Sequence, residues 1–531
     1  MRIARRDVLK GSAAALAAGF SFSGRAPAVA QGASRTLKFI PHADLSSIDP
    51  VGTTGYVVRN HGYMVYDTLY SLDAAFKPRP QMAEGHEVSA DGRTYTIRLR
   101  DGLKFHDGEP VRAVDCVASL KRWAARDGFG QTVIALTDEM PVVDDRTFQF
   151  RLKQRFPLLL EAIGKPSSPV PFIMPERVAR TPATTQIKDA TGSGPFRFLA
   201  DEWVPGSRAA YARFEGYVPR ADPIDGASGG KVVHIDRVEW TIIPDPATAT
   251  AAIRRGEVDW YEQPQGDLLP VLRQNKDIVV TSFDPIGTVV LLRFNHLHPP
   301  FDNPKVRQAV LAAVSQTDYM TAMVGDPALF RECKAYFPCG TPMSTGAGSE
   351  AMVANLDRAK TLLKESGYNG EKVTIISPGD VAYLTVLGIV TEDLLKRLGM
   401  NVDLVTTDWG TVLARRANME PPDKGGWNVF HTTAVGIEFA SPASHLALRG
   451  HSRAAWPGWP TNATIEALRQ QWLDAESFDE QRGLAAQMER EAFAAVPYVP
   501  LGQYQLSTAL RRNVTGLVKA SAPFMWNIRK E

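Results

Sequence analysis

Cysteine is scarce in this chain, with three among 531 residues. Cys333 and Cys339 close the short loop Cys-Lys-Ala-Tyr-Phe-Pro-Cys, and this spacing favours a local disulfide in an oxidising compartment. Cys116 lies in a helix-like run and is expected to be a buried small hydrophobe. Three cysteines at these spacings do not make a zinc site, and the ten histidines form no cluster. We therefore expect neither a metal nor a cofactor.

Long basic runs are missing too, and the formal net charge of the whole chain is only +2. Nucleic acid and anionic membrane surfaces are therefore not indicated as partners. Beyond the first thirty residues, no apolar stretch is long and charge-free enough to predict a transmembrane helix.

Recognisable catalytic motifs are lacking as well. His106-Asp107 is interpreted as a turn between a strand and a helix. Gly192-Ser193-Gly194 has neither the ending of a phosphate-binding loop nor the flanks of a nucleophile elbow, so it indicates a backbone turn. His296 and His298 lie beside two prolines without a carboxylate at ligand spacing, which favours a loop over a metal site. An exported hydrolase is disfavoured because no nucleophile, base and orienting group can be assembled.

The first thirty residues have the layout of an export signal. A twin-arginine pair, Arg5-Arg6, precedes a short alanine-rich apolar run, and Ala28-Val29-Ala30 is typical of a cleavage site. We predict a mature periplasmic protein that begins near Gln31. The leader contains five basic residues and one acidic residue, so the remaining chain has 55 basic and 57 acidic residues and a net charge of −2.

About 500 mature residues suggest two or more lobes, because single cores rarely grow beyond ~250–300 residues. Residues 238–260 show a strand, a helix that ends at Gly256, and a second strand. Residues 373–405 repeat this order, with a helix that ends at Gly399. Both segments are typical of βαβ crossovers, and their separation predicts one sheet in each of two lobes. Between them, Asn303 and Pro304 favour the start of an amphipathic helix.

Residues 56–191 have a different pattern. Residues 95–99 and 147–152 alternate as half-buried strands do, Asp-Gly pairs mark turns, and residues 113–123 suit a helix. We interpret this part as an inserted α+β domain.

Four segments, in order, resemble the solute-binding proteins that deliver peptides, nickel and related solutes to ABC importers, known as family 5. They are Ala90-Asp-Gly-Arg-Thr-Tyr-Thr-Ile-Arg-Leu-Arg-Asp-Gly-Leu-Lys-Phe-His-Asp-Gly-Glu-Pro110, Gly192-Ser-Gly-Pro-Phe-Arg-Phe198, Ile243-Pro-Asp-Pro-Ala-Thr248 with Gly256-Glu-Val-Asp259, and Phe294-Asn295 with Pro299-Pro-Phe-Asp-Asn-Pro-Lys-Val-Arg-Gln308. Each segment alone is a weak signal, whereas four in order over most of the mature chain are specific.

The resemblance implies an α/β, two-lobed periplasmic binding protein fold (type II-like), with the α+β domain inserted in the first lobe. It also implies a non-enzymatic monomer that encloses a solute between hinged lobes and hands it to permease subunits in the inner membrane. The expected parts are the signal 1–30, lobe I as 31–55, 192–285 and 498–531, the inserted domain 56–191, and lobe II as 286–497.

One local stretch bears on the solute. Glu438 lies four residues before Pro442. In peptide-binding relatives, the matching segment has an aspartate at the position of Glu438, and this aspartate holds the ligand's ammonium. A carboxylate in a closed cleft can pair strongly with a desolvated ammonium. The alternative is a solvated or hinge-side carboxylate.

The second anchor of dipeptide-binding relatives, an arginine that holds the ligand carboxylate, is missing from Pro378-Gly379-Asp380. Oligopeptides or another amine-bearing solute fit this departure better than a free dipeptide. Arg415 and Arg416 supply positive charge nearby, although they suit a helix surface equally well. The candidate walls of the site are Trp409, Trp427, Trp456 and Trp459, each of which suits a core equally.

The leading hypothesis is capture of a peptide or a peptide-like amine. An opine, a sugar or a metal chelate is the alternative within transport. A chemoreceptor-coupled or chaperone-like role is not separated from import by the sequence.

Overall fold

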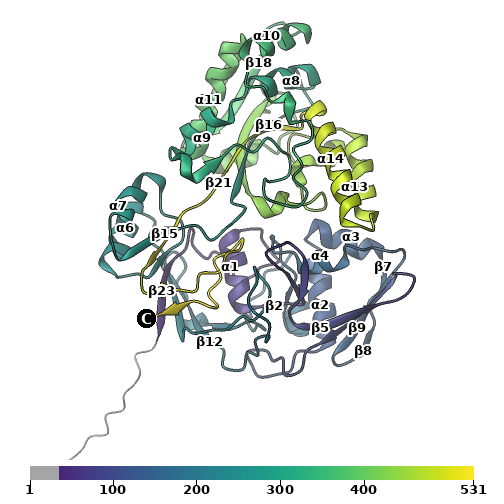
Figure 1. Ribbon diagram of the computed structural model, residues 1–531, viewed down its shortest axis with the longest axis vertical. Helices are drawn as coiled ribbons and strands as arrows, with labels where there is room; N and C mark the ends of the chain where they lie inside the picture. The colour runs from purple at the N-terminus through teal and green to yellow at the C-terminus, as the bar shows by residue number, and fades with distance from the viewer. Residues whose placement is uncertain (1–34) are drawn as a thin grey trace, which may run out of the picture. The chain divides into compact units, whose positions relative to one another are not determined.

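The computed structural model describes residues 35–531, and its main elements are two large sheets, a smaller sheet and the helices around them (Figure 1). The predicted export signal, with its cleavage after Ala30, lies outside the described residues.

The first sheet has seven strands. In spatial order they are β11 (Phe196–Phe198), β12 (Arg208–Arg213), β13 (Arg237–Thr241), β1 (Thr36–Ile40), β14 (Trp260–Tyr261), β22 (Thr508–Arg511) and β15 (Ile278–Thr281). Strand β1 runs parallel to both β13 and β14, so the chain from β13 through helix α6 (Pro246–Arg255) to β14 is a βαβ crossover. Asp245 caps α6 by accepting the N–H of Thr248 at 2.8 Å, and Gly256 ends it with φ of 75°.

The second sheet has six strands. Their order is β17 (Phe330–Arg331), β21 (Tyr498–Tyr504), β16 (Thr288–Phe294), β20 (Val429–Val435), β18 (Lys372–Pro378) and β19 (Asn401–Thr407). Strands β18 and β19 are parallel neighbours joined by α11 (Ala382–Leu398), which confirms the second predicted crossover. The predicted capped helix is α8 (Pro304–Ala313), and Asn303 accepts the N–H of Lys305 at 3.0 Å.

Further helices accompany these two sheets. They are α1 (Tyr56–Val65), α7 (Leu269–Arg273), α9 (Gln316–Val324), α10 (Leu356–Glu365), α12 (Trp409–Arg415), α13 (Ala463–Asp474) and α14 (Phe478–Ala495). Helix α1 is almost entirely buried, since every residue from Val57 to Val65 is buried. The helices α8 and α10 pack against each other, as do α13 and α14 (Figure 1).

The smaller sheet lies in the segment expected as an inserted α+β domain. Its strands are β5 (Ala83–Val88), β6 (Thr94–Leu99), β9 (Thr147–Leu152), β7 (Thr137–Glu139) and β8 (Val142–Asp144). Its helices are α2 (Ala113–Ala124), α3 (Gly128–Leu136), α4 (Leu159–Gly164) and α5 (Glu176–Ala179). Short two-stranded pairs complete the described strands: β2 (Asp67–Thr68) with β10 (Phe172–Ile173), β3 (Tyr70–Leu72) with β4 (Pro78–Pro80), and β23 (Val514–Thr515) with β24 (Arg529–Lys530).

Two chain segments connect the strands of the first sheet with those of the second. One is residues 282–287, between β15 and β16, and the other is residues 505–507, between β21 and β22. Strand β21 therefore pairs with β16 in the second sheet, although residues 498–531 were expected to belong to lobe I. Its buried apolar face completes the second sheet, so the chain returns to the first sheet only after Tyr504.

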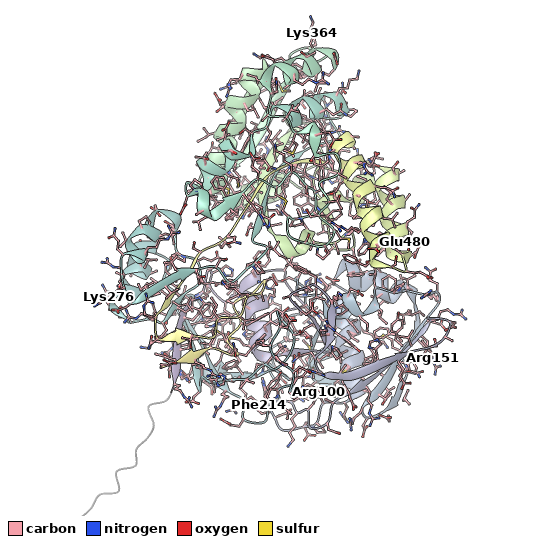
Figure 2. The ribbon with its side chains drawn as sticks, in the orientation of Figure 1. Arg100, Arg151, Phe214, Lys276, Lys364 and Glu480 are labelled. Atoms are coloured by element: carbon pink, nitrogen blue, oxygen red, sulfur yellow. A yellow bond between two sulfur atoms is a disulfide. The ribbon has the colours of Figure 1, made fainter. Side chains whose placement is uncertain are left out.

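Lys276, Lys364 and Glu480 point outward at the periphery (Figure 2). Within residues 35–531, none of the helices combines the length and the apolar character that a membrane span requires.

Candidate functional site

Three neighbouring parallel strands of the second sheet end at one edge. Strand β18 is in register with β19 up to Pro378 opposite Thr407, and it also runs parallel to β20. The loops that follow these strands contain Gly379 and Asp380, then Trp409, and then Glu438. In open α/β sheets, ligands bind beyond the carboxyl ends of strands. Four of the predicted site residues thus follow strands that end at the same edge.

The loop after β18 is bonded to the loop after β19. The N–H of Gly379 donates to the carbonyl of Thr407 at 2.7 Å, and Asp380 Oδ1 accepts the N–H of Trp409 at 2.9 Å. A Cβ at position 379 would lie 2.9 Å from Thr406 Cγ2, so glycine permits this close approach. Gly379 and Asp380 are exposed, and Trp409 is half-buried. These residues form one connected surface beside the strand ends.

Arg415 is held away from that surface. Its Nε donates to the carbonyl of Gly425 at 3.0 Å, and its Nη2 donates to the carbonyl of Gly426 at 2.8 Å. The guanidinium therefore orders the loop that leads into β20. Arg416 instead faces aromatic rings, lying 6.0 Å from the centroid of Trp409 and 5.5 Å from that of Trp456.

Trp427 belongs to the core beneath these loops. Its side chain is fully buried, packs against Phe430 and Trp459 at centroid distances of 4.8 and 5.8 Å, and donates its indole N–H to the carbonyl of Arg416 at 3.1 Å. Trp459 is buried as well. Other side chains cover both rings, and their role as walls of the site stays a prediction.

Glu438 lies in the short helix η6 (Gly436–Phe439) directly after β20, and it contacts α1. Its Oε2 accepts a hydrogen bond from the hydroxyl of Tyr56 at 3.0 Å. Burial raises the pKa of Glu438, whereas this hydrogen bond and the charges of Arg59 and Lys165 lower it. The glutamate thus lies at the boundary between α1 and the second sheet, in a cationic and partly buried setting.

Arg59 is one turn further along α1. Its guanidinium lies 5.0 Å from the ring centroid of Tyr56, and its Nη2 donates to Asn60 Oδ1 at 3.1 Å and to the carbonyl of Ser521 at 3.0 Å. Asp284, in the segment that connects the sheets, is close enough to interact electrostatically with it. Burial raises the pKa of Asp284 to about 6.

Helix α1 also contacts a residue that follows a strand of the first sheet. Glu262 follows β14 and accepts the N–H of His42 at 2.8 Å, His42 Nδ1 at 2.9 Å and Asn60 Nδ2 at 3.3 Å. Helix α1 thus links Glu262 to Glu438 through Asn60 and Tyr56. Sequence reasoning missed Tyr56 and Arg59, because it placed them at the start of the inserted domain. Arg59, Asn60 and His61 interrupt an apolar run, and this is the signal that could have revealed them.

The motifs interpreted as structural turns are structural here. His106 Nε2 lies 3.0 Å from the carbonyl of Gly194, and the N–H of Gly192 donates to His106 Nδ1 at 3.2 Å. Ser193 Oγ donates to the carbonyl of Ile173 at 2.7 Å. His296 and His298 face the carbonyls of Pro497 and Met419. Among the described residues, no group of three or more His, Cys, Asp or Glu side chains is placed to hold a metal ion.

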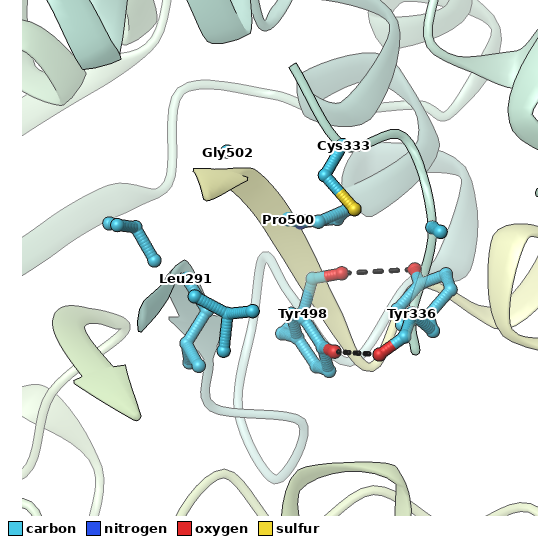
Figure 3. A pocket seen from close by; sticks show the side chains of 9 residues that line it. Leu291, Cys333, Tyr336, Tyr498, Pro500 and Gly502 are labelled. Carbon is cyan, nitrogen blue, oxygen red and sulfur yellow. Dashed lines mark hydrogen bonds between the residues drawn. The ribbon is translucent and has the colours of Figure 1, made fainter. Parts of the chain in front are cut away.

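The predicted disulfide between Cys333 and Cys339 is confirmed, and Cys116 is a buried free thiol as expected. A cavity of about 10 Å³ lies beside the disulfide, where Tyr336 and Tyr498 exchange hydrogen bonds of 3.0 and 3.2 Å (Figure 3). A volume of this size holds at most one water, so it is no solute site. A second hollow of about 570 Å³ lies over α2 and α5, away from the strand ends described above.

Comparisons with known proteins agree with this architecture. The family described as bacterial extracellular solute-binding proteins, family 5, middle part, matches residues 77–447. A probable peptide ABC transporter periplasmic-binding protein, y4tO, of Sinorhizobium fredii (strain NBRC 101917 / NGR234) is 38% identical, and the alignment covers 100% of both chains.

Two solved structures share the fold. The dipeptide-binding protein of Pseudoalteromonas sp. SM9913 with Met-Leu has a TM-score of 0.74 at 19% identity, covering 93% of this chain and 100% of that one. AgaA of A. tumefaciens R10 with agropinic acid has a TM-score of 0.75 at 21% identity, covering 93% and 99%.

The fold is thus that of a two-lobed periplasmic binding protein, and the sequence resemblance is confirmed. The chain belongs to family 5 of the bacterial extracellular solute-binding proteins. This family consists of binding proteins rather than enzymes, in agreement with the sequence-based expectation.

Proposed function

We propose that this protein is the periplasmic binding component of an ABC importer and that it captures a peptide or a peptide-like, amine-bearing solute. The observation that carries the proposal is the position of Glu438: its carboxyl follows a strand end of the second sheet and meets Tyr56 of α1 at 3.0 Å. The relative y4tO, named as a probable peptide-binding protein, supports the same solute class.

Glu438 is suited to an ammonium ligand. It is partly buried, and a solute cation that replaced the Tyr56 hydroxyl would meet a desolvated carboxylate. The surface of Gly379, Asp380 and Trp409 follows adjacent strand ends and would contact the rest of the solute. The loop 378–380 contains a second carboxylate, Asp380, but no arginine. This loop therefore does not supply an anchor for a ligand carboxylate.

The proposed cycle begins with export through the twin-arginine signal and cleavage near Ala30. The mature protein would work as a monomer in the periplasm, with lobe I and lobe II closing over the solute and docking on the permease subunits. The domain division predicted from the sequence is part of this proposal, with β21 assigned to lobe II.

A non-peptide solute is the alternative, because AgaA was solved with agropinic acid and shares the fold. Native mass spectrometry of protein purified from its own periplasm distinguishes the two by weighing any copurified solute. A peptide mass supports the proposal, and an opine, sugar or chelate mass overturns the peptide assignment. The variant Glu438→Gln should lose a cationic solute, whereas the exposed control Glu365→Gln should retain it.

A further inference from the structure

The Arg59 guanidinium differs from the deeply buried cations Arg122, Lys231 and Arg293 in its hydrogen-bond and ion-pair partners. Its residue is only 4% exposed, yet its Nη1 has no hydrogen-bond partner. Within residues 35–531, it also forms no ion pair with a carboxylate within 4.0 Å. A buried cation without a counter-ion is costly, so its presence requires an explanation.

Other buried cations show what a purely structural arrangement looks like here. Arg122 forms an ion pair with Asp49 at 2.7 Å, and Lys231 forms one with Asp67 at 2.6 Å. Arg293, which is fully buried, donates to the carbonyls of Pro457, Ala447, Pro497 and Trp456. Each has its donors directed at acceptors, whereas Arg59 keeps one nitrogen unused.

The groups around Arg59 belong to the proposed solute site. Tyr56 lies under the guanidinium and donates its hydroxyl to Glu438. The charged groups that act on this region are Arg59 and Lys165 on one side, and Glu438 and Asp284 on the other. Lys165 is already paired with Asp127, so Arg59 is the cation that remains for a ligand.

We propose that Arg59 binds an anionic group of the solute, so that Glu438 and Arg59 recognise the ammonium and the carboxylate of a short zwitterion. This inference rests on the proposed function and deepens it. Arg59 occupies the opposite lobe from the loop 378–380, where the sequence lacks an anchoring arginine. Its planar fork is suited to a carboxylate.

The geometry also limits the length of the solute. Arg59 and Glu438 both contact the same tyrosine side chain, one at its ring and the other at its hydroxyl. Two or three extended residues span ~7–10 Å, which is the scale of one tyrosine with its contacts. The ammonium and the carboxylate of the solute are therefore close together, as in a dipeptide or tripeptide or a small amino-acid derivative.

The test uses the mature protein and a defined probe. The probe is an enzymatic casein digest enriched in di- and tripeptides, offered either untreated or after methyl esterification of its carboxyl groups. Native mass spectrometry identifies retained peptides, and calorimetric titration compares one retained peptide with its methyl ester. The variants are Arg59→Gln, Arg59→Lys and the exposed control Arg358→Gln.

We expect the wild type and Arg358→Gln to bind the free acid at least 100-fold more tightly than the ester, and Arg59→Gln to bind both equally weakly. Arg59→Lys should retain part of the preference. The ligand-free Arg59→Gln variant should stay folded with only a modestly lowered melting temperature, because no ion pair is lost and only the hydrogen bonds to Asn60 and to the carbonyl of Ser521 are removed.

Several outcomes overturn the inference. Equal binding of acid and ester by the wild type would remove the anion requirement while leaving the proposed binding function intact. If Arg59→Gln still preferred the free acid to the methyl ester, another residue would bind the carboxylate. A strongly lowered melting temperature in both Arg59 variants would assign Arg59 to the fold. Retention of nothing from either digest would instead count against the peptide-binding function, and this inference would fall with it.

Discussion

Tyr56 donates its hydroxyl to the carboxylate of Glu438 at 3.0 Å, although 382 residues separate them in the chain. Tyr56 begins the buried helix α1 beside the first sheet, and Glu438 follows a strand of the second sheet. The bond therefore joins the two parts of the molecule at the proposed solute site, and a solute ammonium would compete with it.

Glu438→Gln should weaken binding of the copurified solute by roughly 100-fold or more. Removal of one partner of a buried charge pair typically costs ~3–5 kcal/mol, and ~1.4 kcal/mol is a factor of ten. Calorimetric titration measures the loss, with Glu365→Gln as the matched control. Equal affinities of the variant and the wild type would remove Glu438 from the site.

Tyr56→Phe should loosen the ligand-free protein without unfolding it, because the ring remains and only the bond to Glu438 is lost. A hydrogen bond to a charged group is worth about 1.5–3 kcal/mol. Small-angle scattering should show a larger radius of gyration for the ligand-free variant and a normal radius with bound solute. The same radius in both ligand-free proteins would contradict a contact that holds the lobes together.

Glu161 should make stability fall as pH rises from about 4.5 to about 7. Burial raises the pKa of Glu161 to about 7 from an ordinary value of 4.5, and its Oε2 has no partner. Between these values the folded state binds more protons than the unfolded state, so the free energy of unfolding decreases from pH 4.5 to 7 and then levels off.

Glu161→Gln should therefore be more stable than the wild type at pH 8, by up to about 3 kcal/mol, and equally stable near pH 4. Urea unfolding of both proteins at several pH values measures the difference. If the difference in the free energy of unfolding between the two proteins did not change with pH, the pKa of Glu161 would not be raised by folding.

The disulfide between Cys333 and Cys339 should contribute about 2 kcal/mol to stability, because it closes only a short loop. The double variant Cys333→Ser, Cys339→Ser should show this loss in urea unfolding, and a reductant should destabilise only the wild type. The loop is connected to the segment 282–287, because Gln503 bonds both the N–H of Cys339 and the carbonyl of Ile286. An unchanged free energy of unfolding in the double variant would contradict this contribution.

Arg5→Lys with Arg6→Lys should leave precursor in the cytoplasm, because the export machinery recognises the paired guanidinium groups. Cell fractionation followed by immunoblotting measures the distribution. Normal accumulation of the double variant in the periplasm would reject the twin-arginine interpretation.

Local patterns predicted much of the fold. Glycine stops at 256 and 399, the cap at Asn303 and the alternating strands of the inserted domain all depend on neighbours in sequence, and the structure confirms each. The assignment of residues 498–504 went wrong for a non-local reason. A buried apolar strand fits either sheet by its own pattern, and only its pairing with β16 decides between them.

The site was predictable only in part. The ends of β18, β19 and β20 placed Asp380, Trp409 and Glu438 at one edge, which parallel topology implies. The burial of Trp427 was not deducible, because an indole suits a core and a ligand wall equally. Tyr56 and Arg59 come from a distant helix, and nothing local signals which groups they face.

The two connecting segments have a mechanical consequence. Strand β15 pairs antiparallel with β22 up to Thr281 opposite Thr508, and β16 pairs antiparallel with β21 from Thr288 opposite Tyr504. The segments 282–287 and 505–507 therefore run side by side in opposite directions, as a narrow two-stranded strap. Such a strap resists shear and stretching, because both strands would have to slip together, whereas it bends readily across its width. Bending of this strap would move one sheet relative to the other, and Tyr56 and Glu438 lie beside different sheets.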